Sequence, residues 1–131
     1  MSIGGEQIRL RISNAFGVSP LPITEVTVAL PFNGSAGVSA IQPQTLQRLT
    51  WSGNESIVIP NGALAVSDPI EFDIKPESNL AVTMYLADGQ TTNYITSHPG
   101  SRTTSYYTLG NEVDATNLTI TNATEQSSLH W

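Results

Sequence analysis

The chain contains no cysteine and carries few charged residues. Its 131 residues include five lysines and arginines against eleven aspartates and glutamates, which gives a formal net charge of −6. The absence of cysteine excludes disulfide bonds, thiolate catalysis and cysteine-ligated zinc. The basic residues are scattered, so they form no cluster that neutralises a run of phosphates. We therefore expect neither nucleic acid nor an anionic membrane surface as a partner.

Long apolar runs are also missing. No stretch approaches the roughly 20 residues that a membrane-spanning helix needs, so we expect no membrane insertion. Hydrophobic residues make up 39% of the chain, and threonine, serine and asparagine take much of the space that charged residues usually fill. Such a composition is typical of extracellular β-proteins, in which short polar residues occupy turns and outer strand faces.

Apolar and polar residues alternate along most of the chain, with the period of two that is typical of β-strands. The clearest runs are 8–12, 26–30, 70–74 and, longest of all, 80–86. Turn signals rich in glycine, asparagine and proline separate the runs, and no long helical pattern occurs. We predict an all-β fold, an Ig-like or jelly-roll-like antiparallel β-sandwich of about seven or eight strands. The predicted core residues are Leu10, Ile12, Val28, Phe72, Leu80, Val82 and Met84.

Several short motifs recur in one known family. They are residues 3–5, 8–17, 61–63, 67–69, 79–82 and 97–106. Together they resemble the β-rich N-terminal region of secreted fungal and bacterial SGNH (GDSL-type) hydrolases. The resemblance implies an accessory domain whose catalytic Gly-Asp-Ser block lies in a following domain, and this chain contains no Gly-Asp-Ser.

Relative to that family, residues 1–131 are expected to form a single β-sandwich domain that is truncated at both ends. A strand is expected to be missing before residues 2–3, and another to be cut short at 129–131. Because open strand edges present unpaired backbone groups, we expect self-association, most simply a homodimer.

Catalysis has little support in the sequence. The histidines are His98 and His130, and Ser97 and Ser101 lie close to His98. A hydrolase of this type also needs a group that orients the base, a strained turn for the nucleophile and an oxyanion hole, and no Gly-X-Ser-X-Gly is present. We predict no catalytic residue and no enzyme activity.

Metal binding is an alternative use of the acidic residues. Asp68, Glu71 and Asp73 lie close together, but no Asp-X-Asp-X-Asp loop accompanies them. A solvated acidic strand face explains them better than calcium, so no metal or other cofactor is expected.

Exposed aromatic residues offer a third type of site, because tyrosine and tryptophan present flat apolar faces with polar rims. Trp51 is in phase with Leu49 and is expected in the core. Tyr106 and Tyr107 are consecutive, so on a strand one of them faces outward. The predicted ligand-binding residues are Tyr94, His98, Arg102, Tyr106 and Tyr107. The alternative is that these are scattered surface aromatics without a common role.

Four Asn-X-Ser/Thr sequons begin at Asn33, Asn54, Asn117 and Asn122. They favour passage through a secretory pathway and a glycoprotein product. The sequence therefore predicts a secreted, non-catalytic module that recognises a carbohydrate or another cell-surface ligand, lectin-like or immunomodulatory in a fungal setting. The alternative is an accessory-domain fragment of an SGNH esterase, inactive without its catalytic domain.

Overall fold

The computed structural model describes residues 1–89, 92–94, 96–97, 103–121 and 124–127. Antiparallel strands joined by turns and short 3-10 segments make up this part of the chain, so the prediction of an all-β antiparallel fold is confirmed. The strands are β1 (Gly5–Ile8), β2 (Arg11–Ser13), β3 (Leu21–Ile23), β4 (Glu25–Ala29), β5 (Gln47–Arg48), β6 (Ile57–Ile59), β7 (Leu64–Val66), β8 (Ile70–Ile74), β9 (Ala81–Tyr85), β10 (Thr104–Tyr107) and β11 (Thr124–Ser127). The 3-10 segments are η1 (Phe32–Gly34), η2 (Pro43–Thr45) and η3 (Leu118–Thr121).

One layer is an interrupted ribbon in which the 5–13 and 64–74 stretches run antiparallel. β1 pairs with β8 from Gly5 opposite Ile74, and β2 pairs with β7 as far as Ser13 opposite Leu64. Between the two ladders, the Ser67 side chain replaces a backbone partner, because the N–H of Leu10 donates to Ser67 Oγ at 2.9 Å. The interruption explains why the alternating run 8–12 is divided between two short strands.

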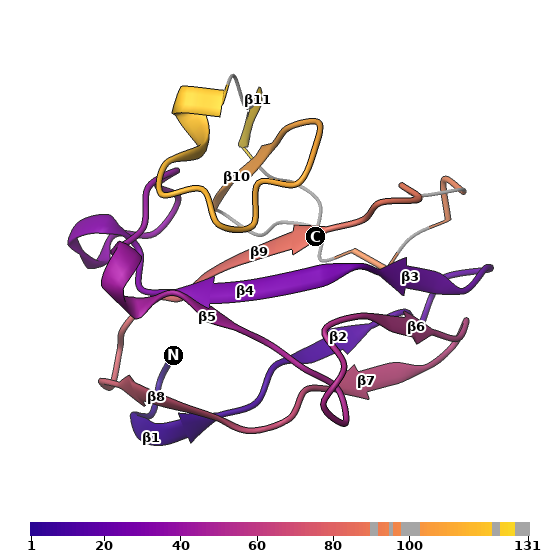
Figure 1. Ribbon diagram of the computed structural model, residues 1–131, viewed down its shortest axis with the longest axis horizontal. Coiled ribbons are helices and arrows are strands. Elements are labelled where there is room, and N and C mark those ends of the chain that lie inside the picture. The colour runs from indigo at the N-terminus through magenta and orange to yellow at the C-terminus, as the bar shows by residue number, and fades with distance from the viewer. Residues whose placement is uncertain (90–91, 95, 98–102, 122–123, 128–131) are drawn as a thin grey trace.

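The second layer is the three-stranded sheet β5-β4-β9, in which β4 is the central strand. Figure 1 shows β4 crossing the middle of the molecule, with the β1 and β8 ladder below it and β10 and β11 above it. Every residue of β4 is buried, because the ribbon covers one face and the segment that follows β10 covers the other. The open sheets thus stack in a sandwich-like arrangement.

The core lies between the two layers. It consists of Ile23, Val26, Val28, Leu49, Trp51, Ile59, Ala65, Phe72 and Ile74. Burial of Val28, Phe72 and Trp51 agrees with the sequence prediction, and Leu10, Ile12, Leu80 and Val82 pack against the core while half-buried.

The prediction that Met84 belongs to the core is wrong. Met84 is 36% exposed, although Val26, which is opposite it on β4, is 0% exposed. Within the described chain β9 ends its sheet, so Met84 has a neighbouring strand on one side and open space on the other.

Asn14 connects two turns at the end of the ribbon. Its side chain is buried, and Nδ2 donates to the carbonyl oxygens of Ser19 at 2.9 Å and Ile59 at 3.1 Å. Its backbone carbonyl accepts hydrogen bonds from the N–H groups of Gly17 and Gly62. A Cβ on Gly17 would lie 1.8 Å from Asn14 Oδ1, so this turn requires glycine. The motif at 8–17 therefore encodes a buried connection between chain segments.

Candidate binding cavity between β9 and β10

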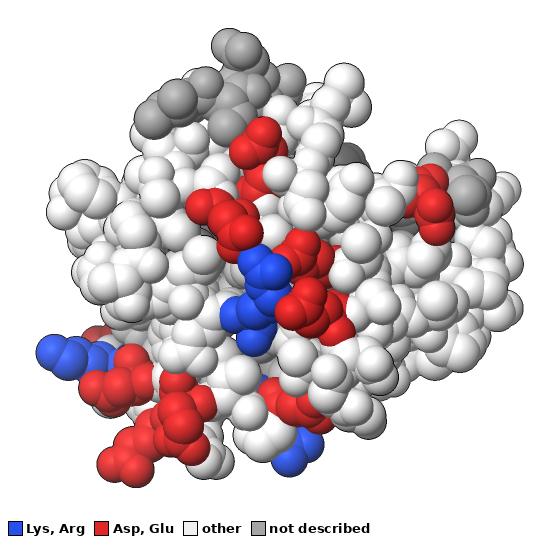
Figure 2. Space-filling model, in the orientation of Figure 1, with Lys and Arg blue, Asp and Glu red and all other residues white. Residues whose placement is uncertain are grey.

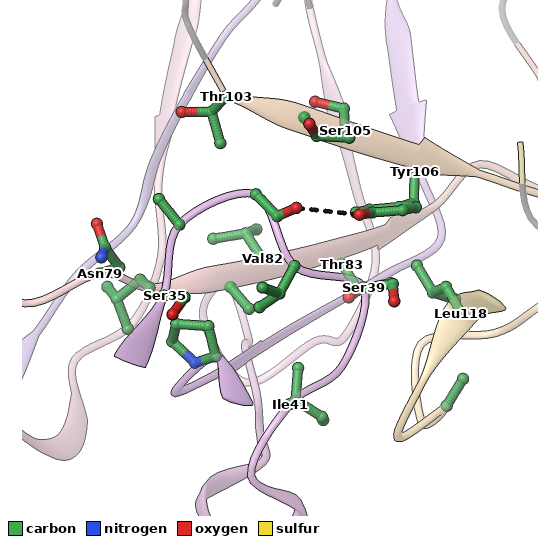
Figure 3. Close-up of a pocket in the computed structure, with 18 of the residues that line it drawn as sticks. Ser35, Ser39, Ile41, Asn79, Val82, Thr83, Thr103, Ser105, Tyr106 and Leu118 are labelled. Carbon is green, nitrogen blue, oxygen red and sulfur yellow. Dashed lines mark hydrogen bonds between the residues drawn. The ribbon is translucent and has the colours of Figure 1, made fainter. Parts of the chain in front are cut away.

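A cavity of about 420 Å³ lies between β9, β10 and the loop that follows η1. Its volume falls in the range of about 300–1,000 Å³ that is typical of ligand sites. The lining comes from three stretches, 35–39, 79–84 and 103–106, together with Pro31, Ile41, Leu86, Ala115 and Leu118. Figure 3 shows Ser105 and Tyr106 on the β10 side, Val82 and Thr83 on the β9 side, and Asn79 and Leu118 toward opposite ends.

Hydrogen bonds at both ends hold the 35–41 loop over the cavity. Asn79 Nδ2 donates to the carbonyl oxygen of Gly34 at 2.8 Å, just before β9 begins. Ser39 Oγ donates to Asn117 Oδ1 at 2.9 Å, and the backbone N–H of Ile41 donates to the carbonyl oxygen of Thr116 at 3.0 Å. The loop is therefore attached to the segments on either side of it.

Gly37 and Tyr106 close the loop onto β10. Tyr106 Oη donates to the carbonyl oxygen of Gly37 at 3.0 Å, as the dashed line in Figure 3 shows. Gly37 has a φ of +69°, and a Cβ at this position would lie 3.2 Å from the backbone nitrogen of Thr104. Both the backbone angle and the close approach favour glycine here.

The described lining residues are uncharged. They include apolar side chains and the hydroxyl groups of Ser35, Ser39, Thr83, Thr104 and Ser105, and Tyr106 is the titratable residue among them. In the described part of the chain, the Ser105 hydroxyl is buried without a hydrogen-bond partner. Buried hydroxyl groups are normally paired, so this oxygen is suited to bond a molecule in the cavity.

A charged cluster holds the 111–115 segment, which supplies Ala115 to the lining. Arg48 contacts Glu25, donates to the two carboxylate oxygens of Asp114 at 2.7 and 2.9 Å, and lies 3.9 Å from Glu55. The hydrogen bond to Asp114 raises the pKa of Arg48, and the nearby negative charges add to the effect. Basic and acidic side chains meet near the middle of the face that Figure 2 shows.

Two further acidic residues, Asp68 and Glu71, have structural partners. Asp68 accepts hydrogen bonds from the backbone N–H groups of Gly53 and Ser52 and from the Thr50 hydroxyl, and these bonds, that of Gly53 first, lower its pKa. Glu71 accepts a hydrogen bond from Gln7. Among the described residues, no three histidine, aspartate or glutamate side chains are placed to hold a metal ion.

The structure separates the three tyrosines among the predicted ligand-binding residues. Tyr106 lines the cavity, while Tyr107 on the opposite side of β10 is 58% exposed. Tyr94 is 70% exposed and lines a small second hollow with residues 19–22 and Asn14. His98 and Arg102 lie outside the described residues. Alternation along the strand predicted that either Tyr106 or Tyr107 faces outward. No local sequence pattern predicted that Tyr106 contacts the 35–39 loop, which is distant in the sequence.

The sequons differ in their surroundings. Asn33 is exposed in η1, and Asn54 is exposed where it forms a β-bridge with Trp51. Asn117 Oδ1 accepts hydrogen bonds from the backbone N–H of Thr119, from its hydroxyl and from Ser39 Oγ. Asn122 lies outside the described residues.

No protein-family model matches the chain, and the search of curated proteins found no match. In the described part of the chain, no helix has both the length and the apolar character needed to cross a membrane.

Proposed function

We propose that this chain is a secreted, non-catalytic recognition module that binds an uncharged cell-surface ligand, carbohydrate or protein, in the cavity between β9 and β10. The observation that carries the proposal is the lining itself, which combines apolar side chains with hydroxyl groups and contains no described charged side chain. An uncharged ligand loses less solvation free energy than an ion on entering such a cavity. The exposed sequons at Asn33 and Asn54 support passage through a secretory pathway.

Filling the cavity tests the proposal. Ala115→Phe adds bulk to a lining position, and Thr116→Phe adds the same bulk at the exposed neighbouring position. Labelled proteins would be applied to a glycan array and to cells pretreated with glycosidase or protease. We expect the unaltered chain and Thr116→Phe to bind alike, and Ala115→Phe to bind at least about tenfold more weakly, a loss of ~1.4 kcal/mol. Equal binding by all three proteins, or no binding by any of them, would contradict the proposal.

Absence of catalysis is part of the proposal and has a separate test. The chain lacks the Gly-Asp-Ser block and the nucleophile-elbow motif, so no activated serine is expected. The protein should not hydrolyse p-nitrophenyl acetate above the background rate. Hydrolysis that disappears in His98→Ala would show that the chain is an enzyme.

We also propose a homodimer. The outward side chains of β6 and β7 offer an apolar surface, because Val58, Leu64 and Val66 are each more than half exposed. The low charge density of the chain opposes association only weakly. Sedimentation equilibrium at micromolar concentration should give twice the 14.0 kDa chain mass, and Leu64→Ser should shift the equilibrium toward the monomer. A monomer at every concentration would overturn this part of the proposal.

The second candidate is the accessory domain of an SGNH esterase. It is favoured by the structural roles of the motif residues, since Asn14, Gly17 and Asp68 hold turns together. Such a relationship would concern the fold and would not imply catalytic activity. Intact mass and sequencing of both ends of the natively isolated protein distinguish the two candidates, because a continuation into a Gly-Asp-Ser block would favour the esterase.

A further inference from the structure

The cavity follows the open edge of β9. Every residue from 79 to 84 contributes to the lining. Successive side chains of a strand point to opposite faces, so a cavity that touches all of them lies along the backbone edge. Among the described strands β9 is the last in the order β5-β4-β9, and its described strand partner is β4.

This edge lacks the usual protection against strand pairing. Natural proteins cover or interrupt open edges with charged side chains, proline or bulges. β9 has the sequence Ala-Val-Thr-Met-Tyr, which contains neither a charge nor a proline, and its five pairs with β4 follow a regular register. The wall opposite is formed by the 35–39 loop and by β10, which pairs with β11 instead. The edge is therefore suited to pairing but faces the cavity and its opposite wall.

We propose that the ligand of this cavity is a peptide segment in extended conformation, which pairs with β9 as the next strand of the sheet. The inference rests on the proposed function, since it uses the same cavity. Main-chain hydrogen bonds supply affinity in strand addition, and the pockets for alternate side chains supply specificity. The 35–39 loop and β10 face this edge across the cavity, so they obstruct the edge of a second folded copy more than they obstruct a separate strand.

The lining also determines which side chains the peptide carries. On one face of β9, Val82 and Met84 are apolar, and on the other Thr83 presents a hydroxyl group. The matching ligand alternates apolar residues with serine or threonine and carries no charge. The lining hydroxyl groups would also bond a carbohydrate, but the unpaired backbone edge of β9 matches a peptide, and the one amide side chain in the lining, that of Asn79, already donates to Gly34.

Hydrogen exchange in the ¹⁵N-labelled chain tests the pairing. The probe is a pool of blocked pentapeptides with valine, isoleucine or leucine at the second and fourth positions and serine or threonine elsewhere. We expect alternate amides of residues 81–85, those that face the cavity, to gain at least about tenfold protection, while those paired with β4 stay unchanged. The control pool carries N-methyl groups on alternate backbone nitrogens, which removes donors and keeps the side chains.

The outcomes separate this inference from the proposed function. Protection by the unmodified pool that is lost in Ala115→Phe and retained in Thr116→Phe supports strand addition. Equal protection by the N-methylated pool, or none by either pool, overturns it. If a glycan binds the unaltered chain and not Ala115→Phe while the peptides do nothing, the recognition function stands and the peptide inference fails. If neither class of ligand binds, both fail.

Discussion

Replacing Asn14 by alanine should destabilise the fold by about 2–4 kcal/mol. The change removes the donor from two carbonyl oxygens, that of Ile59, where the bond is buried, and that of Ser19, where it is part-buried. An unsatisfied buried polar group costs about 1–3 kcal/mol, with less for the carbonyl that water can reach. The small space left by the missing amide adds to the loss. Asn61→Ala is the matched control, because Asn61 is exposed in the adjoining turn and should change stability by less than about 0.5 kcal/mol.

Urea unfolding followed by tryptophan fluorescence measures both variants, since Trp51 is buried in the core. The midpoint should fall for Asn14→Ala while the slope of free energy against urea stays constant. Asn14→Asp provides a second test. Its carboxylate faces carbonyl oxygens without a donor, so its pKa is expected to rise in the folded protein, and the deficit in stability should grow as pH increases from about 4 to 7. A stability of Asn14→Ala within about 0.5 kcal/mol of the unaltered chain would refute the reasoning.

Three further predictions concern other parts of the chain. Because the pKa of Asp68 is lowered in the folded protein, its carboxylate stabilises the fold above the ordinary pKa of 3.8, and this contribution is lost as pH falls through the lower folded value. The melting temperatures of the unaltered chain and of Asp68→Asn should therefore become more similar in acid. Gly37→Ala should lower the melting temperature and speed amide exchange in β10, because the loop must move away from that strand; unchanged exchange would contradict this. In a secretory host, Asn33→Gln and Asn54→Gln should each remove the mass of one glycan, because both side chains are exposed; an unchanged mass in either variant would contradict this.

Sequence alternation predicted which face of a strand is apolar, and it succeeded where a strand is covered by a second layer. Val28 and Phe72 are buried for this reason. Alternation carries no information on whether a strand is central or at an edge, since that depends on partners far along the chain, and Met84 was misplaced as a result. The cavity was not predictable for the same reason, because the contact between Gly37 and Tyr106 joins residues without any common local pattern.

Because β1 pairs with β8, the first strand is synthesised well before its partner. Gly5 is opposite Ile74, so the first strand has no partner until roughly seventy more residues have been made. At about 5–20 residues per second, that interval lasts ~3–14 s. During this time the amphipathic 5–13 stretch stays available to other nascent chains. Its exposed arginines, Arg9 and Arg11, give it the charge that discourages such aggregation. The same two residues that lie on the surface of the finished protein thus protect it before it has folded.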